Sequence, residues 1–266
     1  MNPIPFNQAY SLALYRPVLD GFTPPDGEHD PGRDHTLTFG IYEFMAAPKR
    51  SGTLTIRSER GANGVVVRVD YVKKAPGDYE NLLHAEIHCG GEGWPDLRRW
   101  NGKSEMRGPD GRVLPLTEYA FEGRRESAEW VFKTGKSERR LPRLRPALLP
   151  WTAWAALARM NSDEAFSALH CDFIEDGEHL KHDQRLDIHR TGSMALGGKR
   201  AFLWEERELD AGTLRSPSEV RDGGRDLEVT AFCRTGEGSV PTFYWIAKRE
   251  GPLFMTAGTH AWIRET

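Results

Sequence analysis

The chain has 266 residues, of which 38% are hydrophobic and 28% are charged. That composition is typical of a globular protein with a real core, and it favours a sheet with one face in water over a two-sided α/β fold. Lys and Arg number 36 against 39 Asp and Glu, a formal net charge of −3, so the charge gives no sign of a nucleic-acid partner. No window approaches the roughly 18 apolar residues that would span a membrane.

The first residues, 1–6, lack the charged start and apolar stretch of a signal peptide. As written, the sequence predicts a cytoplasmic protein, whereas a leader removed ahead of Met1 would place it in the periplasm. The cysteines Cys89, Cys171 and Cys233 lie far apart, without a C-x-x-C spacing. We expect small buried side chains rather than disulfide partners.

Residues 1–36 read as an irregular lead-in, because 24–27 and 30–32 are dense turn chemistry. From residue 37 onward, apolar and polar side chains alternate as in strands with one buried face. The strands expected first are 37–45, 51–60, 65–72, 81–89, two flanking a hairpin at 108–111, then 119–121 and 130–132 around a charged turn at 122–126. The basic stretch 136–145 is expected to be a solvated connector.

A helix is predicted over about residues 147–160, where Trp151, Trp154, Ala155 and Ala158 recur at helical spacing. Alternation then resumes. The strands expected after the helix are 166–174, 185–196, 201–209 beyond a Gly197–Gly198 hairpin, then 227–234, 240–248 and 253–264, with a polar insertion at 210–224.

Sequential strands joined by tight turns predict an antiparallel meander. The fold class is therefore mainly β. We expect one large curved antiparallel sheet of about 12 strands, a half-barrel or open barrel, wrapped around the mid-chain helix. Because no linker has the composition of a domain boundary, residues 37–266 are expected to form a single β domain.

Three segments carry a resemblance to a known superfamily. They are 193–202 around the Gly-Gly pair, the strand 240–247, and the turn 249–252 that ends it. Together with the mid-chain helix, they resemble bacterial members of the lipoprotein-carrier (LolA-like) half-barrel superfamily, in outline over residues 37–264. The resemblance implies a concave apolar face that holds an acyl chain or another amphiphile, or a scaffold for another role. This chain departs from it by carrying many polar aromatics and histidines.

The row His84, Glu86 and His88 is the sharpest candidate site. On a strand these three side chains share one face, and a histidine beside a carboxylate can act as a general acid–base pair. His84 and His88 lie about 13 Å apart on a flat strand, so a divalent metal here would need ligands from other strands, such as His170 or His189. We expect no cofactor, with such a metal as an alternative. The row can also be a plain solvent-facing stripe.

Tyr71 and Lys73 lie near the end of the preceding strand. If the two strands pair through the turn at 76–77, either side chain could approach the histidine row and move a proton in an elimination or hydration. A phenol and a cation at a strand end are also ordinary surface features. Tyr71 is thus a candidate catalytic residue and Lys73 a candidate substrate-binding residue.

Tryptophans beside arginines suggest a sugar-binding surface, because sugar C–H faces stack on aromatic rings and guanidinium groups bind hydroxyls or carboxylates. The candidate substrate-binding residues on this ground are Trp94, Trp100, Arg99, Tyr244 and Trp245. Core packing is the competing explanation for most of the tryptophans.

Two functions are favoured. The first is a ligand-binding protein that holds a small carbohydrate or amphiphile on the concave face of the sheet. The alternative is a lyase or hydratase that acts on a sugar-like substrate through His88, Glu86 and Tyr71. A partner-binding module without a small ligand is a third reading, and the oligomeric state is left open.

Overall fold

The computed structural model describes residues 15–44, 47–90, 96–162, 168–196 and 225–265. They contain two helices, α1 (Arg16–Leu19) and α2 (Pro150–Ser162), and a single sheet of 15 strands. The strands are β1 (His35–Phe44), β2 (Pro48–Gly61), β3 (Gly64–Ala75), β4 (Tyr79–Gly90), β5 (Leu97–Arg107), β6 (Tyr119–Glu126), β7 (Glu129–Thr134), β8 (Ser137–Pro142), β9 (Ala147–Leu148), β10 (Ala168–Glu175), β11 (His179–Leu196), β12 (Arg225–Thr235), β13 (Thr242–Ala247), β14 (Gly251–Ala257) and β15 (His260–Glu265).

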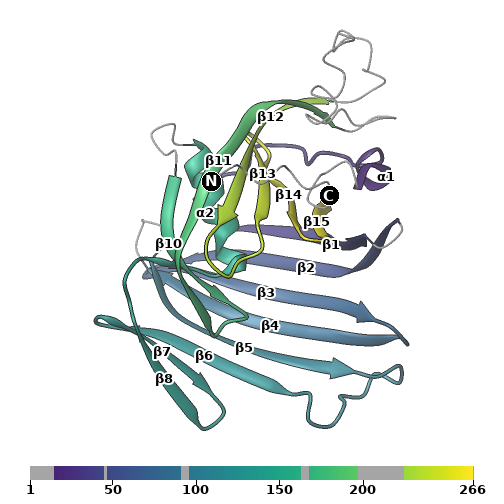
Figure 1. Cartoon of the computed structure of the whole chain (residues 1–266). Coiled ribbons are helices and arrows are strands. Elements are labelled where there is room, and N and C mark those ends of the chain that lie inside the picture. The colour runs from purple at the N-terminus through teal and green to yellow at the C-terminus, as the bar shows by residue number, and fades with distance from the viewer. Residues whose placement is uncertain (1–14, 45–46, 91–95, 163–167, 197–224, 266) are drawn as a thin grey trace.

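The sheet is a meander that curls back on itself around α2 (Figure 1). Strands β1 to β8 follow one another to one edge, while β9 begins the other edge and β10 to β15 return until β15 pairs with β1. Every pairing is antiparallel except that of β9 with β10. Only residues 143–146 connect β8 to β9, so the two edges lie at most roughly 18 Å apart at that point. The expected mainly β, open-barrel architecture is confirmed.

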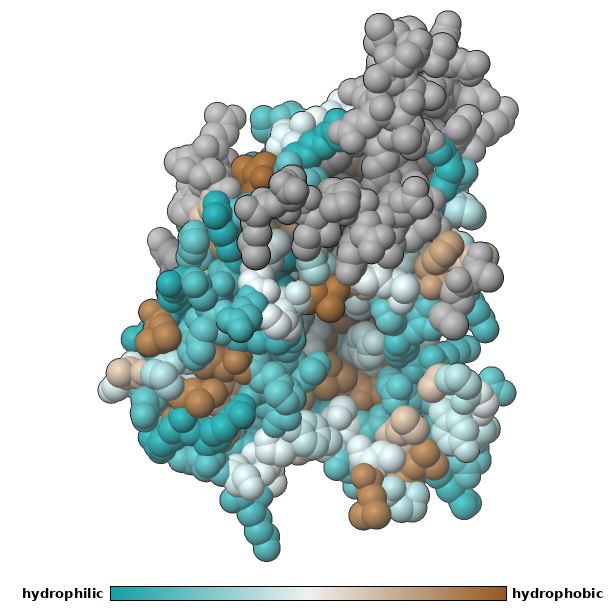
Figure 2. Space-filling model, viewed as in Figure 1, coloured by the Kyte–Doolittle hydropathy of each residue, from teal (hydrophilic) through white to brown (hydrophobic). Residues whose placement is uncertain are grey.

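Alternation along the strands creates the core. In the first strands the inner-face side chains Leu54, Ile56, Val67 and Ile87 are buried, while the residues between them lie on the outer face. Gly64, at φ 137°, begins β3 at the tight turn after β2, where a Cβ would lie 2.0 Å from the Cys89 carbonyl oxygen. Figure 2 shows a mostly hydrophilic surface on this side of the molecule, with apolar side chains gathered in the hollow at its centre.

Helix α2 fills the interior of the curved sheet, as predicted. The Trp154 ring stacks on Phe39 of β1, with centroids 4.8 Å apart and planes at 18°, and meets Tyr244 of β13 edge-on at 5.2 Å. Ala153 and Leu157 are fully buried beside it. An aromatic side chain that buries this much area contributes several kcal/mol, so the helix is held by packing rather than by its own propensity.

The outer face of β12 to β15 is also covered. Tyr15, Leu19 of α1 and Phe22 pack on it, and the Phe22 ring lies 4.8 Å from that of Phe254. Within the irregular lead-in expected for residues 1–36, the described part contains this four-residue helix. With apolar layers on both sides, all six residues of β13 are buried. None of the helices in the described ranges is long and apolar enough to cross a bilayer.

Several predicted boundaries were wrong. The charged stretch 122–126 continues β6, because Glu122, Arg124 and Glu126 take the wet face of an antiparallel strand while Phe121 and Gly123 face the core. Residues 137–142 of the expected connector form β8. The turn at 108–111 forms, but only one bridge, between Arg107 and Val113, follows it before β6.

The expected last strand, 253–264, is two strands, β14 and β15, with a turn at 258–259 between them. The described residues therefore hold 15 strands rather than about 12. The predicted Gly197–Gly198 hairpin, the strand 201–209 and the insertion 210–224 lie outside the described residues.

Candidate functional site

The predicted row His84, Glu86 and His88 lies on the outer face of β4, because Ala85 and Ile87 between them point into the core. The His88 ring donates to the Glu86 carboxylate across 2.7 Å, and this hydrogen bond lowers the pKa of Glu86. His84 is joined in the same way to Asp70 of β3, at 2.7 Å. The row is therefore part of a network of paired charges along a shallow outer groove.

Tyr71 and Lys73 lie on the opposite face from that row. Strands β3 and β4 pair as expected, but Tyr71 faces Leu83 in the register, so both point inward. Lys73 extends inward too and forms an ion pair with Glu43 of β1 at 2.6 Å. The expected approach of Tyr71 or Lys73 to the histidine row is thus wrong, because side chains of adjacent strands share a face only at opposed positions.

The aromatic candidates are not gathered in one place. Trp100 is 2% exposed in the core, where its Nε1 donates to the Gly177 carbonyl at 2.7 Å, while Arg99 projects into the outer groove. Tyr244 and Trp245 are both buried, on opposite faces of β13. Trp94 lies outside the described residues. The sugar-stacking surface expected from Trp100 beside Arg99 is not formed, since adjacent strand residues point to opposite faces.

The other proposed metal ligands are also dispersed. His170 is exposed on β10, and the His189 ring of β11 lies edge-on to Phe243 at 5.6 Å. Within the ranges that the structure describes, no three His, Cys, Asp or Glu side chains are grouped so as to hold a metal ion.

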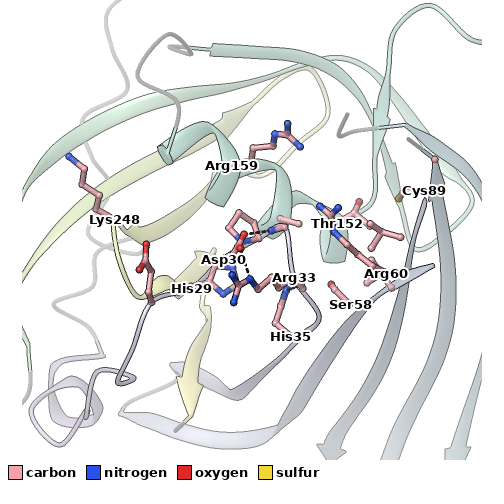
Figure 3. A pocket seen from close by; sticks show the side chains of 17 residues that line it. His29, Asp30, Arg33, His35, Ser58, Arg60, Cys89, Thr152, Arg159 and Lys248 are labelled. Atoms are coloured by element: carbon pink, nitrogen blue, oxygen red, sulfur yellow. Dashed lines mark hydrogen bonds and ion pairs between the residues drawn. The ribbon is translucent and has the colours of Figure 1, made fainter. Parts of the chain in front are cut away.

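A cavity of about 620 Å³ lies at one end of the barrel interior (Figure 3). Its walls are the segment 28–35, the end of β2, the start of β3, the end of β4 and one side of α2. The labelled side chains of the 29–35 segment lie between α2 and the ends of these strands. We call this the cationic cavity, because Arg33, Arg60, Arg159 and Lys248 line it against two carboxylates, Glu28 and Asp30.

The cations differ in their carboxylate partners. Arg33 pairs with Asp30 at 3.1 Å, and Lys248 pairs with Glu228 at 3.5 Å. The backbone N–H of Arg60 donates to Asp34 at 2.6 Å, whereas its guanidinium has no carboxylate partner among the described residues. Arg60 extends β2 in the inward register of Leu54 and Ile56. Arg60 is exposed, and a guanidinium that lines a cavity without an ion-pair partner is suited to bind an anion in bidentate fashion.

Part of the cavity lining is apolar. Val65 and Val67 of β3 and Ala155 of α2 line it, and Val67 is 4% exposed. Thr152 also lines it, but its hydroxyl is already used at the start of the helix, where it accepts from Leu149 N–H at 2.9 Å. Cationic side chains beside aliphatic ones form a lining that an amphiphile with a negative head group would match.

Two histidines, His29 and His35, also line the cavity. The rings of His29 and His35 meet edge to face with centroids 4.7 Å apart. Burial, with the neighbouring His35 and Arg264, lowers the pKa of His29 to about 4, and burial also lowers the pKa of His35. Both rings are therefore neutral at pH 7. His35 Nδ1 donates to the Arg33 carbonyl at 2.8 Å, which leaves its Nε2 as an acceptor.

The segment that carries these histidines is fixed by backbone contacts. His29 N–H donates to the Arg249 carbonyl at 2.7 Å, and Gly32 N–H donates to the Asp30 carboxylate at 2.7 Å, as in an Asx turn. The sequence prediction noted this turn chemistry but missed the histidines and Arg60. The sequence could have indicated Arg60, because it lies an even number of positions from Leu54 and Ile56 and so shares their face of the strand.

No family model matches the chain, and no curated protein matches it. Among solved structures, it is similar to the crystal structure of a beta-barrel-like protein of domain of unknown function DUF1849 from Brucella abortus. The TM-score is 0.52 at 8% sequence identity, over 88% of this chain and 95% of that one. The likeness shows a barrel-like fold. It does not single out the lipoprotein-carrier superfamily among such folds.

Proposed function

We propose that this protein binds a small amphiphile with an anionic head group in the cationic cavity, on the concave side of the sheet. The observation that carries the proposal is the Arg60 guanidinium, which has no carboxylate partner in the described structure and lines a cavity together with Val65 and Val67. The head group would pair with Arg60 and the apolar tail would cover the valines.

The size of the cavity supports a small ligand. Its volume of about 620 Å³ falls within the range of roughly 300–1,000 Å³ common for such sites. A carboxylate or phosphate could accept from the planar guanidinium through two parallel hydrogen bonds. Two neutral histidines nearby add hydrogen-bonding groups without adding a charge that the ligand must match.

The lyase or hydratase alternative has less support. It required His88, Glu86 and Tyr71 to act on one substrate, and Tyr71 lies on the other face of the sheet from the two others. A barrel-like neighbour is compatible with a ligand-binding scaffold in general but carries no ligand identity. We therefore take binding of an anionic amphiphile as the proposed function.

The test is calorimetric titration with decanoate and with decanol, which has the same tail length but no charge. Decanoate is expected to bind with the higher affinity and to raise the melting temperature by mass action. Arg60→Gln is expected to weaken decanoate binding by roughly tenfold or more, because a hydrogen bond to a charged group contributes about 1.5–3 kcal/mol.

Arg57→Gln is the matched control. Arg57 lies on the same strand, but its guanidinium points outward and pairs with Asp70. Its loss should leave decanoate binding unchanged. Equal binding of decanoate and decanol, or equal losses in the Arg60 and Arg57 variants, would contradict the proposal.

A further inference from the structure

A second cavity, of about 480 Å³, lies toward the other end of the barrel interior. Along β3 its lining residue Tyr71 is six positions beyond Val65 of the cationic cavity, which is about 20 Å on a strand. Trp151 of α2 and Trp262 of β15 line it with Leu83 and Met106. We call it the aromatic cavity.

The charge of the aromatic cavity differs from that of the cationic one. None of its described lining residues is Lys or Arg, and its carboxylates are Glu105 and Asp176. Glu105 is already bound by Arg107 at 2.7 Å and Lys103 at 3.2 Å, which lower its pKa. Polar groups without charge, Asn81, Ser104 and Thr117, complete the wall. An anionic ligand has no cationic partner among these lining residues.

A cluster of three titratable side chains lies next to two residues that line this cavity, Tyr71 and Trp262. Lys73 Nζ lies 2.6 Å from Glu43 Oε1 and 3.2 Å from His260 Nε2, and the His260 and Glu43 atoms are 3.3 Å apart. The three residues come from β3, β1 and β15. The β2 residue opposite Lys73 is Gly52, so no side chain stands between Lys73 and β1 on that face. A Cβ there would lie 2.1 Å from the Val72 carbonyl oxygen.

Two aromatic residues join the cluster to the cavity. The ring of Trp262 lies nearly parallel to that of His260, with centroids 6.0 Å apart and planes at 30°. Burial and, to a lesser extent, the Glu43 carboxylate raise the pKa of Tyr71 to about 12. Its hydroxyl therefore keeps its proton and can donate to a ligand.

We propose that the aromatic cavity is a second binding site, for the neutral, hydroxyl-rich ring of a small saccharide. The C–H face of the ring would stack on Trp262, since partly exposed indole faces suit such surfaces. Its hydroxyls would accept from Tyr71 and from Lys73 and donate to Glu43. The cluster offers both donors and acceptors, which a polyol needs and a fatty acid does not.

The experiment titrates the full chain with maltose and with cellobiose, both neutral, and follows tryptophan fluorescence and saturation-transfer NMR. At least one of them should bind saturably below about 10 mM, a weak but measurable affinity. Trp262→Leu and Lys73→Met are each expected to weaken binding by roughly tenfold. Arg60→Gln, in the cationic cavity, should leave it unchanged.

Other outcomes would overturn the proposal. These are no binding of either sugar in the same range, wild-type affinity in both variants, or saccharide binding that is lost in Arg60→Gln or displaced by decanoate. If Trp262→Leu does not fold, as judged by its melting curve, the saccharide affinities of Lys73→Met and Tyr71→Phe decide whether the proposal holds. Neither change leaves a large void, and each removes a polar group that the ligand would use. Decanoate binding measured on the same variants separates this site from the proposed function.

Discussion

The indole Nε1 of Trp100 donates a hydrogen bond to the carbonyl oxygen of Gly177 across 2.7 Å. Trp100 lies in the middle of β5, and Gly177 lies in the turn between β10 and β11. In the sheet order β5 stands ten places from β10 and nine from β11, and the two residues are far apart on the chain, yet the curl of the sheet brings them together. The contact thus ties the two halves of the barrel across its interior.

Replacing Trp100 by Phe should destabilise the protein by about 1–3 kcal/mol. The change keeps an aromatic ring but leaves the Gly177 carbonyl without its buried donor. The free energy of unfolding from urea titration measures the effect. Trp151→Phe is a suitable comparison, because Trp151 is partly exposed and its indole donates no hydrogen bond to a described residue. Equal effects of both changes would argue against a role for the Trp100 hydrogen bond.

Gly177→Ala should be more destabilising than an ordinary glycine replacement. Gly177 has φ 76°, and a Cβ there would lie 2.2 Å from the ring of Phe121. The expected loss is about 2–4 kcal/mol, from the left-handed backbone together with the forced shift of a buried ring. Gly135→Ala, measured in parallel by urea unfolding, isolates the backbone part: its φ is 57° and its Cβ would meet nothing within 4 Å. Equal losses of unfolding free energy at both sites would show that the Phe121 ring moves aside at little cost.

Acid should destabilise the wild type relative to His29→Gln. The pKa of His29 is about 4 in the folded state against an ordinary 6.5, chiefly because the ring is buried. As the pH falls from about 6.5 to about 4, the unfolded chain takes up a proton that the folded chain refuses, so stability decreases with decreasing pH in this window. Below the folded pKa the loss is complete.

Urea unfolding at a series of pH values tests this. The free energy of unfolding of the wild type minus that of His29→Gln should decrease by on the order of 2 kcal/mol between pH 7 and pH 4. His35 and the carboxylates titrate in both proteins, so their effects largely cancel. Curves that stay parallel over the window would contradict a neutral, buried His29.

Replacing both His84 and His88 by Ala should leave the fold and the decanoate affinity nearly unchanged. Both rings lie on the outer face and pair with carboxylates in partly exposed positions, where such pairs contribute about 0–1 kcal/mol. Melting curves and calorimetry on the double variant provide the measurement. A large loss of decanoate binding would return the functional site to the histidine row.

Strand alternation made much of the fold predictable. Leu54 and Ile56, or Ala85 and Ile87, reveal a buried face at a spacing of two, and the spacing of Trp151, Trp154 and Ala158 reveals the helix. The prediction was wrong where a charged stretch was interpreted as a turn, as at Glu122 to Glu126. A strand with one wet face carries charges at every second position, and the residues between them, such as Gly123, need not be large.

The candidate site was much less predictable. Local periodicity placed His84, Glu86 and His88 on one face, but which face became the inside depended on the closure of the whole sheet. Arg60 and His29 lie thirty-one positions apart along the chain and meet across the cationic cavity. Lys73, Glu43 and His260 come from three strands whose register the sequence does not state.

By itself the sequence determined the β character of the chain, the position of its helix and the identity of the residues that alternate. These features follow from nearest-neighbour sterics and from the burial of apolar side chains at a fixed spacing. Only the tertiary structure decided which face of each strand is enclosed and which distant charges meet. Those outcomes depend on how 15 strands close around α2, a matter of long-range packing that no short window of sequence contains.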